Sequence, residues 1–150
     1  MDSPVSAGPA EMDIHKEFSK AILSNISVFA NHPGEFSEGM VRSLFKKPPA
    51  DIDLRRLVQS TLQTPTDSGI AMLVMDIFGA DRRPILANLR KPALVIASSE
   101  SPLLDVQKEM AAGIPGAKFV VVEDAAHAVF IDQPGKFDDA IQTFLRSLAQ

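Results

Sequence analysis

Residues 114–137 read IPGAKFVVVEDAAHAVFIDQPGKF, and this stretch carries the strongest indication of the fold. Its centre, KFVVVED (118–124), is a continuous apolar and β-branched run without helical period, which predicts a strand buried on both faces. A Pro-Gly pair ends the segment before the run, and a loop with a single histidine, His127, follows it. The stretch therefore predicts a buried strand followed by a loop that holds a histidine.

A second run of the same kind lies upstream. PALVIAS (92–98) is also apolar and β-branched without helical period, so the two runs together predict a parallel sheet. A helix is expected between them over 103–112, because Gly113 and the Pro-Gly pair that follows it stop the helical pattern. Apolar residues recur at helical spacing from Phe137 to Leu148 and predict an amphipathic last helix. The order β-α-β-loop-α indicates an α/β fold with a short parallel unit.

Two strands make an incomplete parallel sheet. Such a sheet usually has about five or six strands and both faces covered. A two-stranded version leaves at least one long apolar edge unpaired. We therefore expect the chain to be part of a larger sheet, or to receive strands from a partner, either a second copy or a complementing N-terminal half.

The first half of the chain predicts helices only. Apolar residues at helical spacing indicate four short helices, joined by segments rich in Pro and Gly. Ser37 is predicted as the N-cap of the second helix and Asp51 as the N-cap of the third. The four apolar sets run from Phe18 to Phe29, from Phe36 to Leu44, from Leu54 to Leu62 and from Ile70 to Ile77.

Composition is that of one ordinary soluble globular domain and excludes several classes of protein. The chain has 150 residues, 45% of them hydrophobic, and a formal net charge of −4. Its Lys and Arg residues are scattered rather than clustered, which argues against a nucleic acid partner. No apolar run approaches the roughly 18–20 residues that span a membrane. The absence of Cys excludes disulfides and thiolate nucleophiles, and it is compatible with the cytoplasmic location that we predict.

The N-terminus and the histidines give further negative expectations. Residues 1–13 contain neither the basic nor the apolar region of a secretory signal, and we expect a flexible lead-in there. His15, His32 and His127 show no ligand spacing, so neither a metal nor a cofactor is expected. The predicted organisation after the lead-in is a helical region over 14–79 and an α/β segment over 80–150.

Several segments, taken in order, resemble the C-terminal part of the α/β-hydrolases. They are the strand KPALVI, the helix after it, the segment IPGAKFVVVEDAAH and the helix in FIDQPGKFDDAIQTFL, over about Pro92 to Leu148. Residues 14–78 resemble the helical cap that is inserted between the two halves of the core sheet in that fold. The resemblance implies a partial α/β-hydrolase that lacks the N-terminal half with the nucleophile.

The resemblance also implies a Ser-His-Asp/Glu mechanism, in which an imidazole takes the proton of a serine and an acid orients the imidazole. His127 matches the family histidine. Ser101 stands where the family has its carboxylate, so the adjacent Glu100 is the predicted acid and Asp105 a more distant candidate; some members place the acid after an earlier strand. No G-x-S-x-G nucleophile motif occurs, and the Ser-Gly pair in DSGI (67–70) lies inside a helical pattern.

Two hypotheses about function remain open on the sequence alone. In the first, the chain is the C-terminal part of an esterase-like hydrolase of small molecules, supplies His127 as the base and is active only together with the nucleophile half. In the second, it is a non-catalytic, degenerate hydrolase-like module that dimerises through its open sheet edge. The displaced acid favours the second hypothesis, and the family histidine favours the first.

Overall fold

The computed structural model describes residues 8–10, 14, 16–47 and 49–149. Within these residues the chain forms two compact units, which we call the sheet unit (residues 43–47 and 83–149) and the helical unit (residues 8–42 and 49–82). Most of the predicted lead-in lies outside the described residues, and Gly8–Ala10 forms a short 3-10 helix, η1. None of the described helices is long and apolar enough to cross a membrane.

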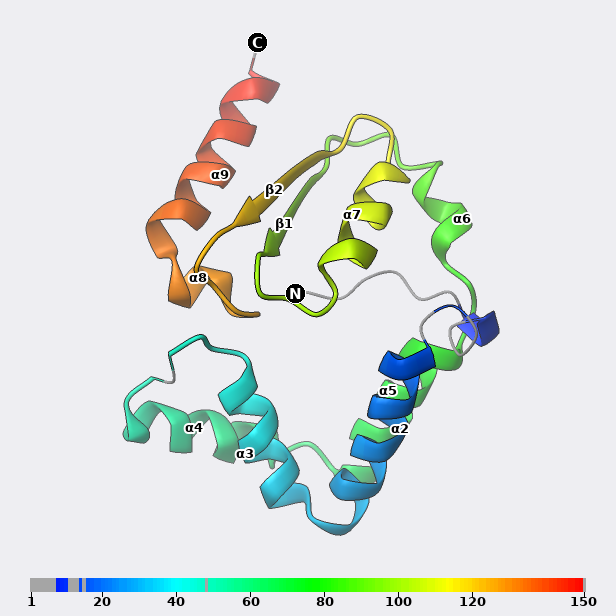
Figure 1. Ribbon diagram of the computed structural model, residues 1–150, viewed down its shortest axis with the longest axis vertical. Helices are drawn as coiled ribbons and strands as arrows, with labels where there is room; N and C mark the ends of the chain where they lie inside the picture. The colour runs from blue at the N-terminus through cyan, green and yellow to red at the C-terminus, as the bar shows by residue number, and fades with distance from the viewer. Residues whose placement is uncertain (1–7, 11–13, 15, 48, 150) are drawn as a thin grey trace. The chain divides into compact units, whose positions relative to one another are not determined.

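The sheet unit contains two parallel strands, β1 (Leu94–Ser98) and β2 (Lys118–Val122). They pair in register, with Leu94 opposite Lys118 and Ser98 opposite Val122. The helix α7 (Leu104–Ala112) connects them, α9 (Pro134–Leu148) follows, and the two helices lie on either side of the strands (Figure 1). The predicted α/β class and the parallel pairing are confirmed. Two short helices that the sequence pattern does not indicate are α6 (Arg83–Leu86) and α8 (Val129–Asp132).

The core of the sheet unit lies at the carboxyl end of the strands. Val122, Ala125 and Val129 are buried together, and half-buried apolar side chains pack against them. The prediction of strands buried on both faces is wrong for most of their length. In β1 the residues from Leu94 to Ile96 are only half-buried, and in β2 only Val122 is buried, with Val121 37% exposed. Two strands with one helix on each side are too narrow a layer to cover these positions.

The helical unit confirms the four predicted helices, although their beginnings differ. Ser37 is not an N-cap but lies buried inside its helix, because the helix begins at Pro33, whose fixed φ suits a first turn. Asp51 is the first residue of its helix, where an acidic side chain is favourable, and Ala50 is the N-cap. The helices are α2 (Lys16–Asn31), α3 (Pro33–Ser43), α4 (Asp51–Thr61) and α5 (Thr66–Phe78).

The contact of α2 with α5 depends on a glycine. The ring of Phe29 is 8% exposed and stacks on Phe36, with ring centroids 4.5 Å apart. A Cβ added to Gly69 would lie 2.5 Å from the Cε1 atom of Phe29. Because the same ring also stacks on Phe36, it has little room to move, and a methyl group at residue 69 would force apart two packed helices.

Gly69→Ala is therefore expected to lower the free energy of unfolding by about 1–3 kcal/mol through overpacking. Gly39→Ala is the matched control, since residue 39 is also helical and a Cβ there meets nothing within 4 Å. Gly39→Ala is expected to raise the free energy of unfolding by about 0.5–1 kcal/mol, because alanine has a higher helix propensity than glycine. Urea unfolding followed by circular dichroism measures both, and equal stabilisation by the two changes would mean that the Phe29 ring is not held.

Candidate active site

The candidate site lies where the two strands end. Parallel pairing of Ser98 with Val122 makes the chain leave both strands at the same edge of the sheet. The amide of Ser99 still donates to the carbonyl of Val122, at 3.0 Å, as the strands end. The turn that holds Glu100 and the loop that holds His127 therefore start from neighbouring positions.

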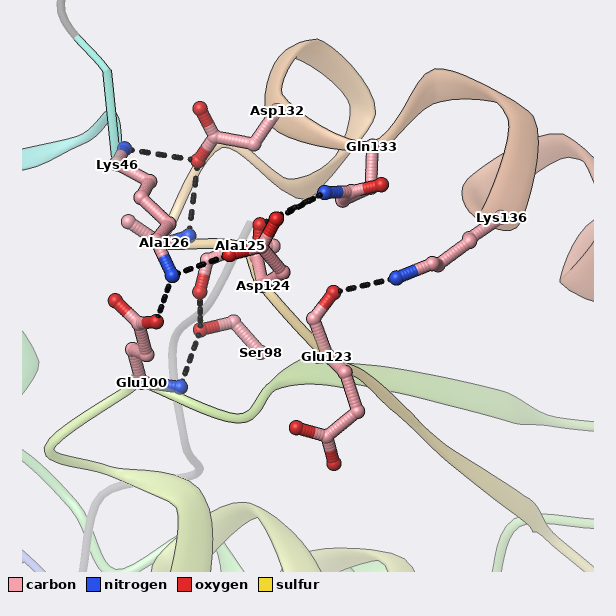
Figure 2. A network of polar contacts seen from close by, with 10 residues as sticks. All are labelled: Lys46, Ser98, Glu100, Glu123, Asp124, Ala125, Ala126, Asp132, Gln133 and Lys136. Atoms are coloured by element: carbon pink, nitrogen blue, oxygen red, sulfur yellow. Dashed lines mark hydrogen bonds and ion pairs between the residues drawn. The ribbon is translucent and has the colours of Figure 1, made fainter.

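Ser98 ties this turn to this loop. Its side chain is fully buried, and its hydroxyl donates to the carbonyl of Ala125 at 2.9 Å. The same hydroxyl oxygen accepts from the amide of Glu100 at 3.2 Å (Figure 2). One hydroxyl thus satisfies one backbone group on each side of the site.

His127 is half-buried in the loop between β2 and α8, and its two neighbours in the chain are anchored. The amide of Ala126 donates to Oδ2 of Asp132 at 2.8 Å. The amide of Ala128 donates to the carbonyl of Leu44 at 2.7 Å. The loop is therefore held on both sides of the imidazole.

A lysine far away in the sequence joins the carboxylates of the site. The Lys46 ammonium forms ion pairs with the side chains of Glu100 and Asp124, and its backbone amide donates to Asp132 at 3.0 Å (Figure 2). Asp124 adopts a left-handed conformation with φ 65°, which the short polar side chain of an aspartate tolerates. In the described structure the predicted acid, Glu100, thus forms an ion pair with Lys46 through Oε1.

The ion pairs shift two pKa values. The hydrogen bond from Lys46 lowers the pKa of Asp124 below its ordinary value of 3.8. The hydrogen bonds to Asp124 and, next, to Glu100 raise the pKa of Lys46 above its ordinary value of 10.5. The aspartate contribution to stability is complete above pH 3.8 and is lost as the pH falls through the lowered pKa. The lysine contribution is complete below pH 10.5 and is lost as the pH rises through the raised pKa.

Lys46→Met is accordingly expected to cost stability that depends on pH in a defined way. The difference in unfolding free energy from the wild type is expected to be constant between pH 3.8 and 10.5 and to shrink outside that window. Urea midpoints at a series of pH values measure it. Lys47→Met removes the same formal charge but only the smaller Coulombic effect of Lys47 on Asp124, and none of these hydrogen bonds. A pH dependence as large as that of Lys46→Met would contradict the assignment to the Lys46 ion pairs.

The structure also places the other residues that the sequence suggests for the site. Ser101, at the position of the family acid, accepts a hydrogen bond from the amide of Leu103 through its hydroxyl, at 3.1 Å, and shapes the turn before α7. Asp105 is exposed in the first turn of α7. In the described part of the chain, no three His, Asp or Glu side chains converge to hold a metal ion. The sequence pattern does not single out Lys46 or Asp132 as residues of the site. The only signals are the lysine pair at 46–47 and an acid two residues before Pro134.

Comparison with known proteins gives the fold. No family model and no curated protein matches. An esterase from Exiguobacterium antarcticum matches with a TM-score of 0.76 at 15% identity, over 85% of this chain and 48% of the other. A bromoperoxidase from Bacillus anthracis matches with a TM-score of 0.74 at 16% identity, over 83% and 48%. An enol-lactonase from Burkholderia xenovorans LB400 matches with a TM-score of 0.69 at 20% identity, over 85% and 50%.

The class of structure that these matches define is the α/β-hydrolase fold. The chain spans about half the length of the matching structures, so its fold is a partial one. The residues that the structure describes are mostly helical and contain a two-stranded parallel sheet.

Proposed function

We propose that the chain is the C-terminal part of an esterase-like hydrolase of small molecules and supplies His127 as the general base. The observation that carries this proposal is the common edge at which β1 and β2 end, which brings the turn of Glu100 beside the loop of His127. A serine from the remainder of the enzyme would give its proton to the imidazole and attack the carbonyl carbon of an ester.

Glu100 is the proposed acid. To orient the imidazole, its carboxylate must contact His127 through Oε2, since Oε1 binds Lys46. Each oxygen of a carboxylate accepts hydrogen bonds, so the two contacts are compatible. Arrival of the serine-bearing half favours the second contact, since a protonated imidazole then needs a counter-charge.

A fluorophosphonate probe tests the proposal. The probe phosphonylates an activated serine, whose oxygen displaces fluoride while its proton passes to the base. The polypeptide that carries the chain is purified from its source with any subunit that accompanies it, and is then treated with the probe. We expect one labelled serine outside residues 1–150 and hydrolysis of p-nitrophenyl acetate that the label abolishes. Absence of both would contradict the proposal.

A second candidate function is a non-catalytic module that dimerises through its open sheet edge. Two observations favour it. Ser101 stands at the position of the family carboxylate, and the carboxylate of Glu100 forms an ion pair with Lys46. The mass in solution of the same preparation distinguishes the two functions. An unlabelled dimer in which β1 amides are protected from exchange supports the module, whereas a labelled complex of any mass supports the hydrolase.

A further inference from the structure

Leu44 and Lys46, two residues of the sheet unit, contact the histidine loop and its neighbouring residues at three points. The carbonyl of Leu44 accepts from the amide of Ala128, 2.7 Å away. The amide of Lys46 donates to Oδ2 of Asp132, and the same oxygen accepts from the amide of Ala126. The contact with Leu44 holds the residue after His127. The contact of Lys46 with Asp132 holds the acceptor of the residue before it, so the segment is tied to the chain on both sides of His127.

The side chain of Lys46 adds the third point. Its ammonium bridges Asp124, at the start of the loop, and Glu100, in the facing turn. Gln133, which follows α8, joins the same network, since its side-chain amide donates to the carbonyl of Asp124 at 2.9 Å (Figure 2). These bonds reach the loop from its beginning to its end.

The contacts are built into the fold rather than lying loosely on its surface. Ala128 is 4% exposed and Ala125, on the same loop, is fully buried. A buried amide that loses its acceptor costs far more than an exposed one, so the carbonyl of Leu44 is required where it is. Charge-assisted bonds to Asp132 are also stronger than neutral ones.

We propose that residues 44–46 form a clip that fixes the orientation of His127, with Lys46 and Asp132 as positioning residues. The proposal rests on the function proposed above for the imidazole and adds what holds it. A general base loses efficiency steeply when it is displaced from the proton it must take. The clip therefore acts on turnover through geometry and leaves substrate binding unaffected.

Amide hydrogen exchange at Ala126 and Ala128, followed by NMR on the full chain, tests the clip without any need for activity. Asp132→Ala removes the acceptor that the amides of Ala126 and Lys46 share. It is expected to speed exchange by about tenfold or more at Ala126, which loses its acceptor, and at Ala128, whose acceptor Leu44 is then no longer held through Lys46. Asp132→Asn keeps one side-chain oxygen and is expected to recover most of the protection. Lys46→Met is expected to give a smaller increase, which Lys46→Arg reverses because a guanidinium also bridges two carboxylates. Lys47→Met, on the exposed neighbouring lysine, is the control and is expected to change neither amide.

Kinetics of the active preparation distinguish a positioning role from a merely structural one, because a structural contact would not change kcat alone. For Asp132→Ala and Lys46→Met we expect kcat for p-nitrophenyl acetate to fall by about 10–100-fold while KM stays within about twofold. Unchanged exchange in both variants overturns the clip, and so does faster exchange with unchanged kcat. If the wild type takes no fluorophosphonate label, the proposed function fails, whereas the exchange data still decide whether residues 44–46 hold the loop.

Discussion

Replacing His127 by glutamine is expected to slow phosphonylation of the serine and turnover of p-nitrophenyl acetate by about 10⁴-fold or more, since loss of a triad member has effects of this size. Glutamine fills a similar volume and forms hydrogen bonds, but its amide does not accept the serine proton at neutral pH. The backbone amides of Ala126 and Ala128 hold the loop, and the change leaves both of their hydrogen bonds in place. The stability of the variant is therefore expected to stay within about 1 kcal/mol of the wild type.

The rate of fluorophosphonate labelling in stopped-time samples measures the chemical step, and a urea titration measures the stability. His32→Gln is the matched control, because His32 is exposed between α2 and α3, and it is expected to retain the wild-type rate. Retention of more than about one hundredth of the rate in His127→Gln would contradict the assignment of the base, because general base catalysis contributes roughly 10²–10⁴-fold even in modest cases.

Ser98→Ala is expected to lower the free energy of unfolding by about 2–3 kcal/mol. The reason is that one hydroxyl serves two backbone groups. Its loss leaves the buried carbonyl of Ala125 and the part-buried amide of Glu100 without this partner. For a chain of this length the melting temperature is expected to fall by roughly 4–12 °C.

Ser99→Ala is the control for Ser98→Ala. The side chain of Ser99 is half-buried, and the hydrogen bond that this residue makes to Val122 comes from its backbone amide, which alanine keeps. A change within about 0.5 kcal/mol is expected for it. Calorimetry of both variants measures the difference, and equal effects of the two changes would mean that the Ser98 hydroxyl does not join the turn to the loop.

Much of the fold is predictable, because the spacing of apolar residues along the sequence distinguishes helices from strands. The runs at 92–98 and 118–124 predict β1 and β2, and the stripe from Phe137 to Leu148 predicts α9. Helix beginnings are less predictable, because several local signals compete near each of them. The helix α3 begins at Pro33, four residues before the predicted N-cap Ser37. Both signals are plausible, because a proline favours a first helical turn and a serine favours an N-cap.

The site could be predicted only where its residues lie next to a strand. His127 and Glu100 follow β2 and β1 directly, so the parallel pairing places their backbones at one edge. Lys46 could not be predicted, because its partners Glu100 and Asp132 lie 54 and 86 residues away along the chain. No local pattern encodes such a pairing, which depends on how the whole sheet unit folds.

The path of the chain limits how the helical unit can be exchanged. Residues 43–47 belong to the sheet unit, whereas the helices before and after them belong to the helical unit. A shuffling experiment that replaced residues 14–79 as a cassette would therefore remove Leu44 and Lys46 together with the helices. Grafts that keep 43–47 and exchange only the flanking helices preserve the acceptor of the Ala128 amide. Recombination between relatives is thus constrained to crossover points on either side of a five-residue segment.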